Sequence, residues 1–293
     1  MAKLMYKQLL FSKHTVFILL ILLATSVLSF GYSFMSRLMW INLVETGTYG
    51  GSLERTLELI ENYNGTQFIR EMWFNPVTEA AVLKIILLIA WIGVYFTAQL
   101  QIERENGFGN LVITRSSYAE RFRNILLSQT LYIVTVMFVY VFLSVLLAFL
   151  VGGVPSTGFR LGDGDYIGRL SLLGTYFAQF VWLSVMLSAF NAFSLVCSAW
   201  IRHKLLLRIL PFLLYIIIPD VVGTIIGNTF PATAPILWRY VSGGLISLLE
   251  FVFFQPHLTA LQALFSHLGV VTSLVAFLIL YRPHIKKGSV NYL

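Results

Sequence analysis

Long stretches without a charged residue alternate with short charged segments along the whole chain. Five gaps free of Asp, Glu, Lys and Arg separate Lys13 from Arg37, Lys84 from Glu103, Arg123 from Arg160, Arg169 from Arg202, and Glu250 from Arg282. A sixth apolar stretch, between Arg208 and Arg239, is interrupted only by Asp220. A helix of about 20 apolar residues crosses the ~30 Å hydrocarbon core of a bilayer. The pattern therefore predicts an all-α polytopic membrane protein with six transmembrane helices, near 15–35, 82–101, 125–150, 171–199, 205–226 and 258–281.

The composition supports the same class. Of 293 residues, 58% are hydrophobic and only 11% are charged, and the mean hydropathy is +0.81. Soluble domains carry about 25% charged residues, so an ordinary soluble enzyme is excluded, as is a disordered chain. A single cysteine excludes a disulfide scaffold. We expect one transmembrane domain over residues 1–293, multi-pass in the plasma membrane.

The distribution of basic residues predicts the orientation. Six spans place both termini on one side, and that side then holds 13 of the 20 Lys and Arg residues but three of the 13 acids. Short loops rich in Lys and Arg face the cytoplasm. Both termini are therefore expected in the cytoplasm, with an uncleaved first span. The formal net charge of +7 follows from this topology, so no nucleic-acid partner is expected.

Three segments between the spans have a pattern of their own. Residues 1–14 alternate apolar residues with lysines, which predicts an interfacial helix in the headgroup layer, or else a frayed start of the first span. Residues 36–80 form a long external loop with a short amphipathic helix that begins after Ser52. Residues 228–256 contain an apolar run too short to cross comfortably, which predicts a re-entrant hairpin before the last span.

The second connection, residues 101–123, is charged, interrupted by glycines and longer than a plain helix-to-helix turn. A plain turn remains the alternative. We interpret this segment as a cytoplasmic docking element. Its candidate contact residues are Glu103, Arg104, Glu105, Gly107, Arg115 and Arg121.

Candidate pathway or gate residues lie within or between the later spans. Asn191 belongs to a row of small polar residues in the fourth span, which fits either a pathway lining or a helix–helix seam. Pro219 breaks the fifth span next to Asp220, and intramembrane acids usually face a bundle interior or a wet cavity. A structural pair or cap is the alternative for Asp220. Glu250 lies in the re-entrant stretch.

Sequence signatures of catalysis are missing. The chain has no Walker motif, no H-E-x-x-H and no G-x-S-x-G. No His, Cys and carboxylate set has metal-ligand spacing, and we interpret His257 and His267 as structural. We therefore expect no catalytic residue, metal or cofactor in this chain.

The order of these segments resembles the permease subunits of type-2 ABC exporters. The stretch Glu103-Arg104-Glu105-Asn106-Gly107, followed by Thr114-Arg115-Ser116 and Arg121, is similar to that family's coupling region. The resemblance implies a separate ATPase subunit, which binds ATP and Mg and docks at residues 103–121. It also implies a second permease protomer, identical or different, with the export pathway between the two.

Other classes remain open at this point. An ion-coupled secondary transporter would use Asp220 and need no ATPase. An intramembrane enzyme would need converging polar groups, for which Asp220, His257 and His267 are the candidates. A passive scaffold would need neither. For an exporter, an apolar, aromatic-rich bundle fits an amphipathic cargo such as a peptide, an antibiotic or a lipid-like drug.

Overall fold

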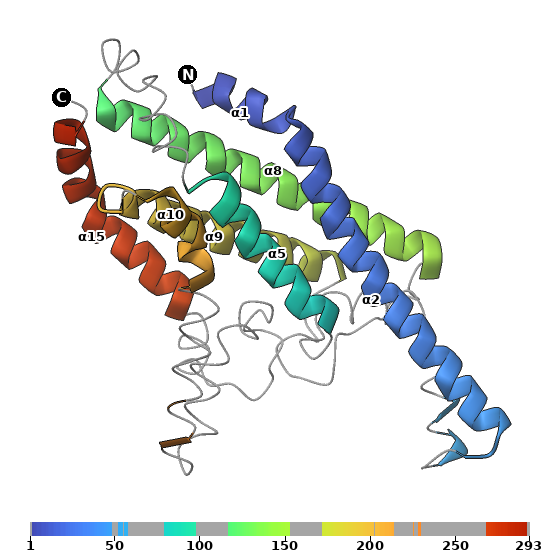
Figure 1. Cartoon of the computed structure of the whole chain (residues 1–293). Helices are drawn as coiled ribbons and strands as arrows, with labels where there is room; N and C mark the ends of the chain where they lie inside the picture. Colours follow the sequence, from blue (N-terminus) through green and yellow to red (C-terminus); the bar gives the residue numbers. More distant parts are fainter. Residues whose placement is uncertain are drawn as a thin grey trace.

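A computed structural model describes residues 2–48, 52–54, 56–57, 79–97, 117–152, 172–201, 203–213, 225, 228–229 and 268–291. These residues form a bundle of α-helices (Figure 1). The helices are α1 (Ala2–Leu10), α2 (Lys13–Glu45), α5 (Glu79–Tyr95), α8 (Tyr118–Gly152), α9 (Leu172–Cys197), α10 (Lys204–Phe212) and α15 (Leu268–Asn291). The all-helical expectation is confirmed for this part of the chain.

Each predicted span coincides at least in part with one of these helices, because long apolar runs can satisfy their backbone groups in a membrane only as helices. Two are long and apolar enough to cross a bilayer, over Tyr118–Leu147 of α8 and Phe180–Cys197 of α9. A third candidate is the pair of Ala2–Leu10 and Lys13–Leu28, which is bent by 55°. The chain is thus an all-helical protein with two to three candidate membrane spans in its described residues.

Helix α2 is longer than the span predicted within it. It continues to Glu45 and contains 33 residues, about 50 Å at 1.5 Å per residue. That length exceeds the ~30 Å hydrocarbon core of a bilayer, and α2 continues ten residues past the predicted span, which ends at residue 35. The first residues of the predicted loop 36–80 are therefore helical. After Ser52 a helical turn follows, in which the Thr56 amide donates to the Ser52 carbonyl at 3.2 Å. Residues 58–78 lie outside the described residues.

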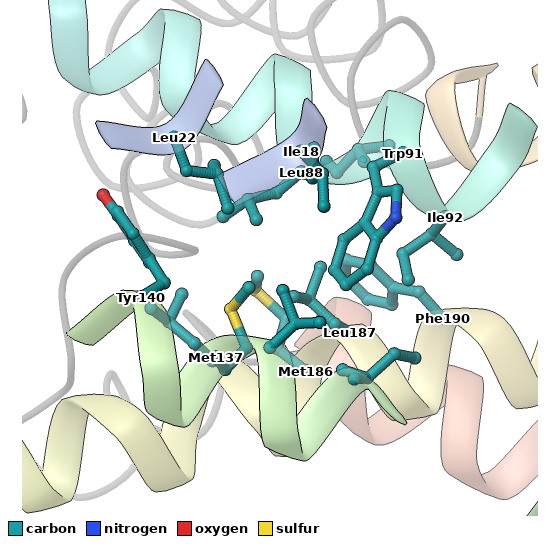
Figure 2. Close-up of a cluster of buried hydrophobic side chains, with 14 of the residues drawn as sticks. Ile18, Leu22, Leu88, Trp91, Ile92, Met137, Tyr140, Met186, Leu187 and Phe190 are labelled. Atoms are coloured by element: carbon teal, nitrogen blue, oxygen red, sulfur yellow. The ribbon is translucent and has the colours of Figure 1, made fainter. Parts of the chain in front are cut away.

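The core is built where α2, α5, α8 and α9 meet. Figure 2 shows apolar side chains from these four helices pointing toward one another. They include Leu22 of α2, Trp91 of α5, Met137 of α8 and Phe190 of α9. Other faces of these and the neighbouring helices expose large apolar side chains, for example Phe17 of α2, Phe142 of α8 and Leu278 of α15. An apolar interior together with an apolar exterior is what a helix bundle in lipid requires.

Helices α5 and α10 approach each other closely at Gly93. A β-carbon placed on Gly93 would overlap the backbone carbonyl oxygen of Arg208. Small residues permit such backbone contact between membrane helices. Gly93 therefore sets how near α10 lies to α5.

One end of the bundle gathers both terminal helices. A small apolar cluster there combines Phe122 of α8, Val196 of α9 and Tyr281 of α15 with Met5 of α1. In Figure 1 the beginning of α1, the beginning of α8 and the end of α15 lie toward the same end of the molecule. The first and last described helices thus share one end, which we call the terminal end.

Candidate functional site

Most of the predicted site residues lie outside the described residues. This applies to five of the docking candidates, Glu103, Arg104, Glu105, Gly107 and Arg115, and to three of the pathway candidates, Pro219, Asp220 and Glu250. The structure does place Arg121, in the first turns of α8, and Asn191, in α9. It also describes the two helices that flank residues 101–116 in the sequence, namely α5 before them and α8 after them.

Helix α8 begins at a well-capped position directly after this segment. The Ser117 hydroxyl accepts a hydrogen bond from the Glu120 amide at 3.2 Å, and the Ser117 carbonyl accepts one from the Arg121 amide at 3.1 Å. The Glu120 carboxylate lies in the first turn, where the helix dipole favours a negative charge. The helix therefore starts at a defined residue at the terminal end.

The first residue of α8 is joined to α9 and α15 through His284. The fully buried imidazole lies 2.9 Å from the Tyr118 hydroxyl at Nε2 and 2.7 Å from the Val196 carbonyl oxygen at Nδ1. A carbonyl oxygen can only accept, so Nδ1 carries the hydrogen and donates to it. In the neutral ring, Nε2 then accepts from Tyr118. One side chain of α15 thus holds both the start of α8 and the end of α9.

Aromatic rings enclose this histidine. The Phe122 ring lies 4.3 Å from the imidazole, centroid to centroid, and the Trp200 ring lies at 6.3 Å. The ammonium group of Lys287 is 5.5 Å from the centre of the Trp200 ring, within the range of a cation–π contact. We call Tyr118, Phe122, Val196, Trp200 and His284 the terminal junction. It connects three helices where residues 101–116 join α8.

Arg121 borders the terminal junction, and its side chain is only 3% exposed. The sequence interpretation placed Arg121 among the docking contacts. Its burial means that a partner would reach it only through the residues around it. Its role in docking stays a prediction, and we expect Arg121 to support the docking segment from a buried position rather than to contact the partner directly.

A second polar cluster fixes the bend between α1 and α2. The Thr15 hydroxyl donates to the Leu9 carbonyl at 2.8 Å, so the Tyr132 hydroxyl, 2.7 Å away, donates to Thr15. The Ser12 hydroxyl lies 3.1 Å from that of Tyr95. We call Ser12, Thr15, Tyr95 and Tyr132 the elbow clamp. It ties the bend to α5 and α8, the two helices that enclose residues 101–116.

Asn191 lies in the interface between α8 and α9. Its amide group donates to the Gln129 side-chain oxygen at 2.9 Å, and both side chains are fully buried. The side-chain oxygen of Asn191, Oδ1, has by contrast no hydrogen-bond partner among the described residues. The hydrogen bond to Gln129 joins α9 to α8, which supports the interpretation of Asn191 as part of a helix–helix seam. A pathway role for Asn191 stays a prediction.

The described residues contain no group of three or more His, Cys, Asp or Glu side chains that could hold a metal ion. No protein-family model, curated protein or solved structure matches this chain. The composition, the helices and the two polar clusters are therefore the features of this chain that bear on its function.

The sequence interpretation did not single out the terminal junction or the elbow clamp. His284 follows Pro283 in a basic stretch, where Arg282, Lys286 and Lys287 suggested only a cytoplasmic tail. Tyr132 and Tyr95 lie within apolar runs and look like membrane residues. A histidine or tyrosine in such a run needs a hydrogen-bond partner, and that is the signal that could have drawn attention to them.

Replacing His284 with leucine is expected to destabilise the protein by about 1–3 kcal/mol, because two buried hydrogen bonds are lost. The matched control is His203→Leu, since His203 is exposed at the start of α10 and caps no amide with its side chain. That control should change stability by less than ~0.5 kcal/mol. Thermal unfolding of the purified chain in detergent measures both. Equal melting temperatures for the two variants would contradict the role of the junction.

Proposed function

We propose that this chain is the membrane-spanning permease subunit of an ATP-driven exporter of the ABC type. A separate ATPase subunit docks on residues 103–121, and a second permease protomer completes the pathway. The chain crosses the membrane six times in the ranges expected from its charge-free gaps, with a re-entrant hairpin in 228–256 and both termini in the cytoplasm.

The observation that carries the proposal is the terminal junction. It follows the charged segment directly and joins α8, α9 and α15 through Tyr118, His284 and Val196. A displacement of residues 101–116 would therefore act on three helices together, rather than on one flexible turn. The elbow clamp ties the bend between α1 and α2 to α5 and α8, the helices before and after residues 101–116.

Two further features fit the proposal. The first and last described helices lie at one end of the bundle, as an even number of crossings requires. The helices also present exposed apolar side chains such as Phe138 and Ile279, as lipid contact requires.

In the proposed cycle, ATP binding closes two ATPase subunits against each other. Their movement shifts residues 101–116 and tilts the helices fastened at the terminal junction. Coupling requires the segment to contact the ATPase differently in the two states, and Glu103, Glu105 and Arg115 are the proposed contacts. Asn191, Pro219, Asp220 and Glu250 line or gate the path of an amphipathic cargo.

The partner can be tested by purification of the tagged chain from its native membranes. We expect a subunit with a Walker motif and ATP-hydrolysing activity to copurify in stoichiometric amount. Reconstituted chain that moves cargo across vesicles with no ATPase subunit present would refute the proposal.

The orientation can be tested by cysteine labelling, since Cys197 is the only cysteine of the chain. In a Cys197→Ser background, Asn106→Cys should react with a membrane-impermeant maleimide only after the cells are permeabilised. The control Thr48→Cys, at an exposed position beyond the end of α2, should react in intact cells. Labelling of residue 106 in intact cells would place the docking segment outside and contradict the proposal.

A further inference from the structure

The surface of α1 and of the bend that follows it is both basic and apolar. Lys3, Lys7 and Lys13 are exposed there. Beside them, the Phe11 side chain is 82% exposed and that of Leu4 is 63% exposed. We call these five residues the elbow surface. No acidic residue occurs before Glu45, so nothing in this part of the sequence neutralises the lysines.

The other face of α1 is occupied by the protein itself. Met5 packs in the apolar cluster of the terminal end, and the Tyr6 hydroxyl lies 2.9 Å from that of Thr135 in α8. With 100° between successive residues of a helix, Lys3, Leu4, Lys7 and Phe11 lie on the face that points away from these contacts. The elbow surface is therefore held outward in a fixed orientation.

The elbow clamp fixes the second half of this surface. Ser12 is the residue before α2, yet its hydroxyl caps no amide of the helix and lies 3.1 Å from the hydroxyl of Tyr95. The Thr15 hydroxyl donates to the Leu9 carbonyl near the end of α1 and accepts from the hydroxyl of Tyr132. Phe11 and Lys13 are thus exposed at a bend in which the Ser12 and Thr15 hydroxyls are bonded within the protein.

We propose that the elbow surface binds anionic phospholipids of the leaflet at the terminal end. The three ammonium groups match negatively charged headgroups, and Phe11 and Leu4 enter the acyl region next to them. Basic residues beside exposed aromatic and aliphatic residues on one helix face are typical of helices that lie in an anionic lipid surface. Binding holds α1 in the headgroup layer and, through the elbow clamp, biases the positions of α5 and α8. The proposal does not depend on the ATPase partner.

The test is a lipid titration of the purified full-length chain in a neutral detergent. Dioleoyl phosphatidylglycerol is compared with dioleoyl phosphatidylcholine, and the rise in melting temperature is followed against lipid concentration. We expect phosphatidylglycerol to act at a concentration at least ~10-fold lower. Changing Lys3, Lys7 and Lys13 together to alanine should raise the half-saturating concentration of phosphatidylglycerol roughly 100-fold, because each lysine near an anionic surface strengthens binding about five-fold.

Two controls separate this site from general electrostatics. Changing the three lysines to arginine should preserve the preference for phosphatidylglycerol. Removing the same charge elsewhere at the terminal end, with Arg123→Ala, Arg282→Ala and Lys286→Ala combined, should shift the half-saturating concentration less than three-fold. All six positions are exposed, so each variant should keep its melting temperature in detergent alone.

Three results would overturn the proposal. The first is an equal rise in the half-saturating concentration of phosphatidylglycerol in the two triple alanine variants, which would mean that net charge alone determines lipid binding. The second is an equal stabilisation by soluble glycerol phosphate, which would indicate an ion site rather than a lipid surface. The third is a loss of ATPase copurification in the lysine variant with unchanged lipid preference, which would make the surface a protein interface.

Discussion

Reversing the charge of Glu103 and Glu105 together to lysine is expected to reduce the chain-dependent increase in ATP hydrolysis at least ten-fold. If these carboxylates meet basic groups of the ATPase, lysines there oppose like charges, and such a juxtaposition costs several kcal/mol. Each ~1.4 kcal/mol is a factor of ten in binding. The measurement is phosphate release by the purified complex in proteoliposomes, compared with the ATPase subunit alone.

The matched control is Glu45→Lys combined with Glu54→Lys. Both residues are exposed, Glu45 at the end of α2 and Glu54 in the turn after Ser52, and both are expected on the opposite side of the membrane. The control carries the same change in net charge, and both variants should insert at the normal level. Unchanged stimulation in the Glu103 and Glu105 variant, at equal membrane abundance, would rule out docking at these residues.

Replacing Gly93 with alanine is expected to destabilise the bundle by roughly 1–3 kcal/mol, the cost of overpacking a close contact. The new methyl group would overlap the carbonyl oxygen of Arg208, and the carbon of that carbonyl would lie 3.3 Å away. A flexible side chain could move aside, but the obstacle is backbone within α10. Either α10 shifts away from α5 or the contact strains.

Gly31 of α2 provides the control, because a β-carbon there would meet nothing within 4 Å. In a helix interior, alanine is otherwise favoured over glycine by about 0.5–1 kcal/mol. Gly31→Ala should therefore keep or raise the melting temperature while Gly93→Ala lowers it. Unfolding in detergent, followed by tryptophan fluorescence, distinguishes them. A similar melting temperature for the two variants would refute the close approach of α5 and α10.

Hydropathy predicted the positions of α8 and α9 well, and the end of α2 less well. The predicted span 171–199 nearly coincides with α9, and 125–150 lies inside α8. The end of α2 was missed by ten residues, because the backbone hydrogen bonds of a helix continue unchanged where its apolar run ends. A charge such as Arg37 marks where the lipid is expected to end and does not mark where the helix ends.

The candidate site was only partly predictable. Residues 101–123 were identified as special from their charges and glycines, but the side chains that join this segment to the bundle were not. The partners Tyr118 and His284 are 166 residues apart. No local pattern could indicate that they meet. The buried position of Arg121 was missed for the same reason, since in the sequence it is one of several arginines in a charged segment.

The amino-acid sequence by itself determined that this chain is helical and suited to lipid. Apolar runs of this length leave no other way to satisfy the backbone in a membrane. Only the tertiary structure decided which polar groups meet: His284 with Tyr118 and Val196, Thr15 with Tyr132, and Gly93 with the backbone of Arg208. Those meetings depend on the rotation and pairing of helices distant in sequence. Packing sets both, and hydropathy contains no information about either.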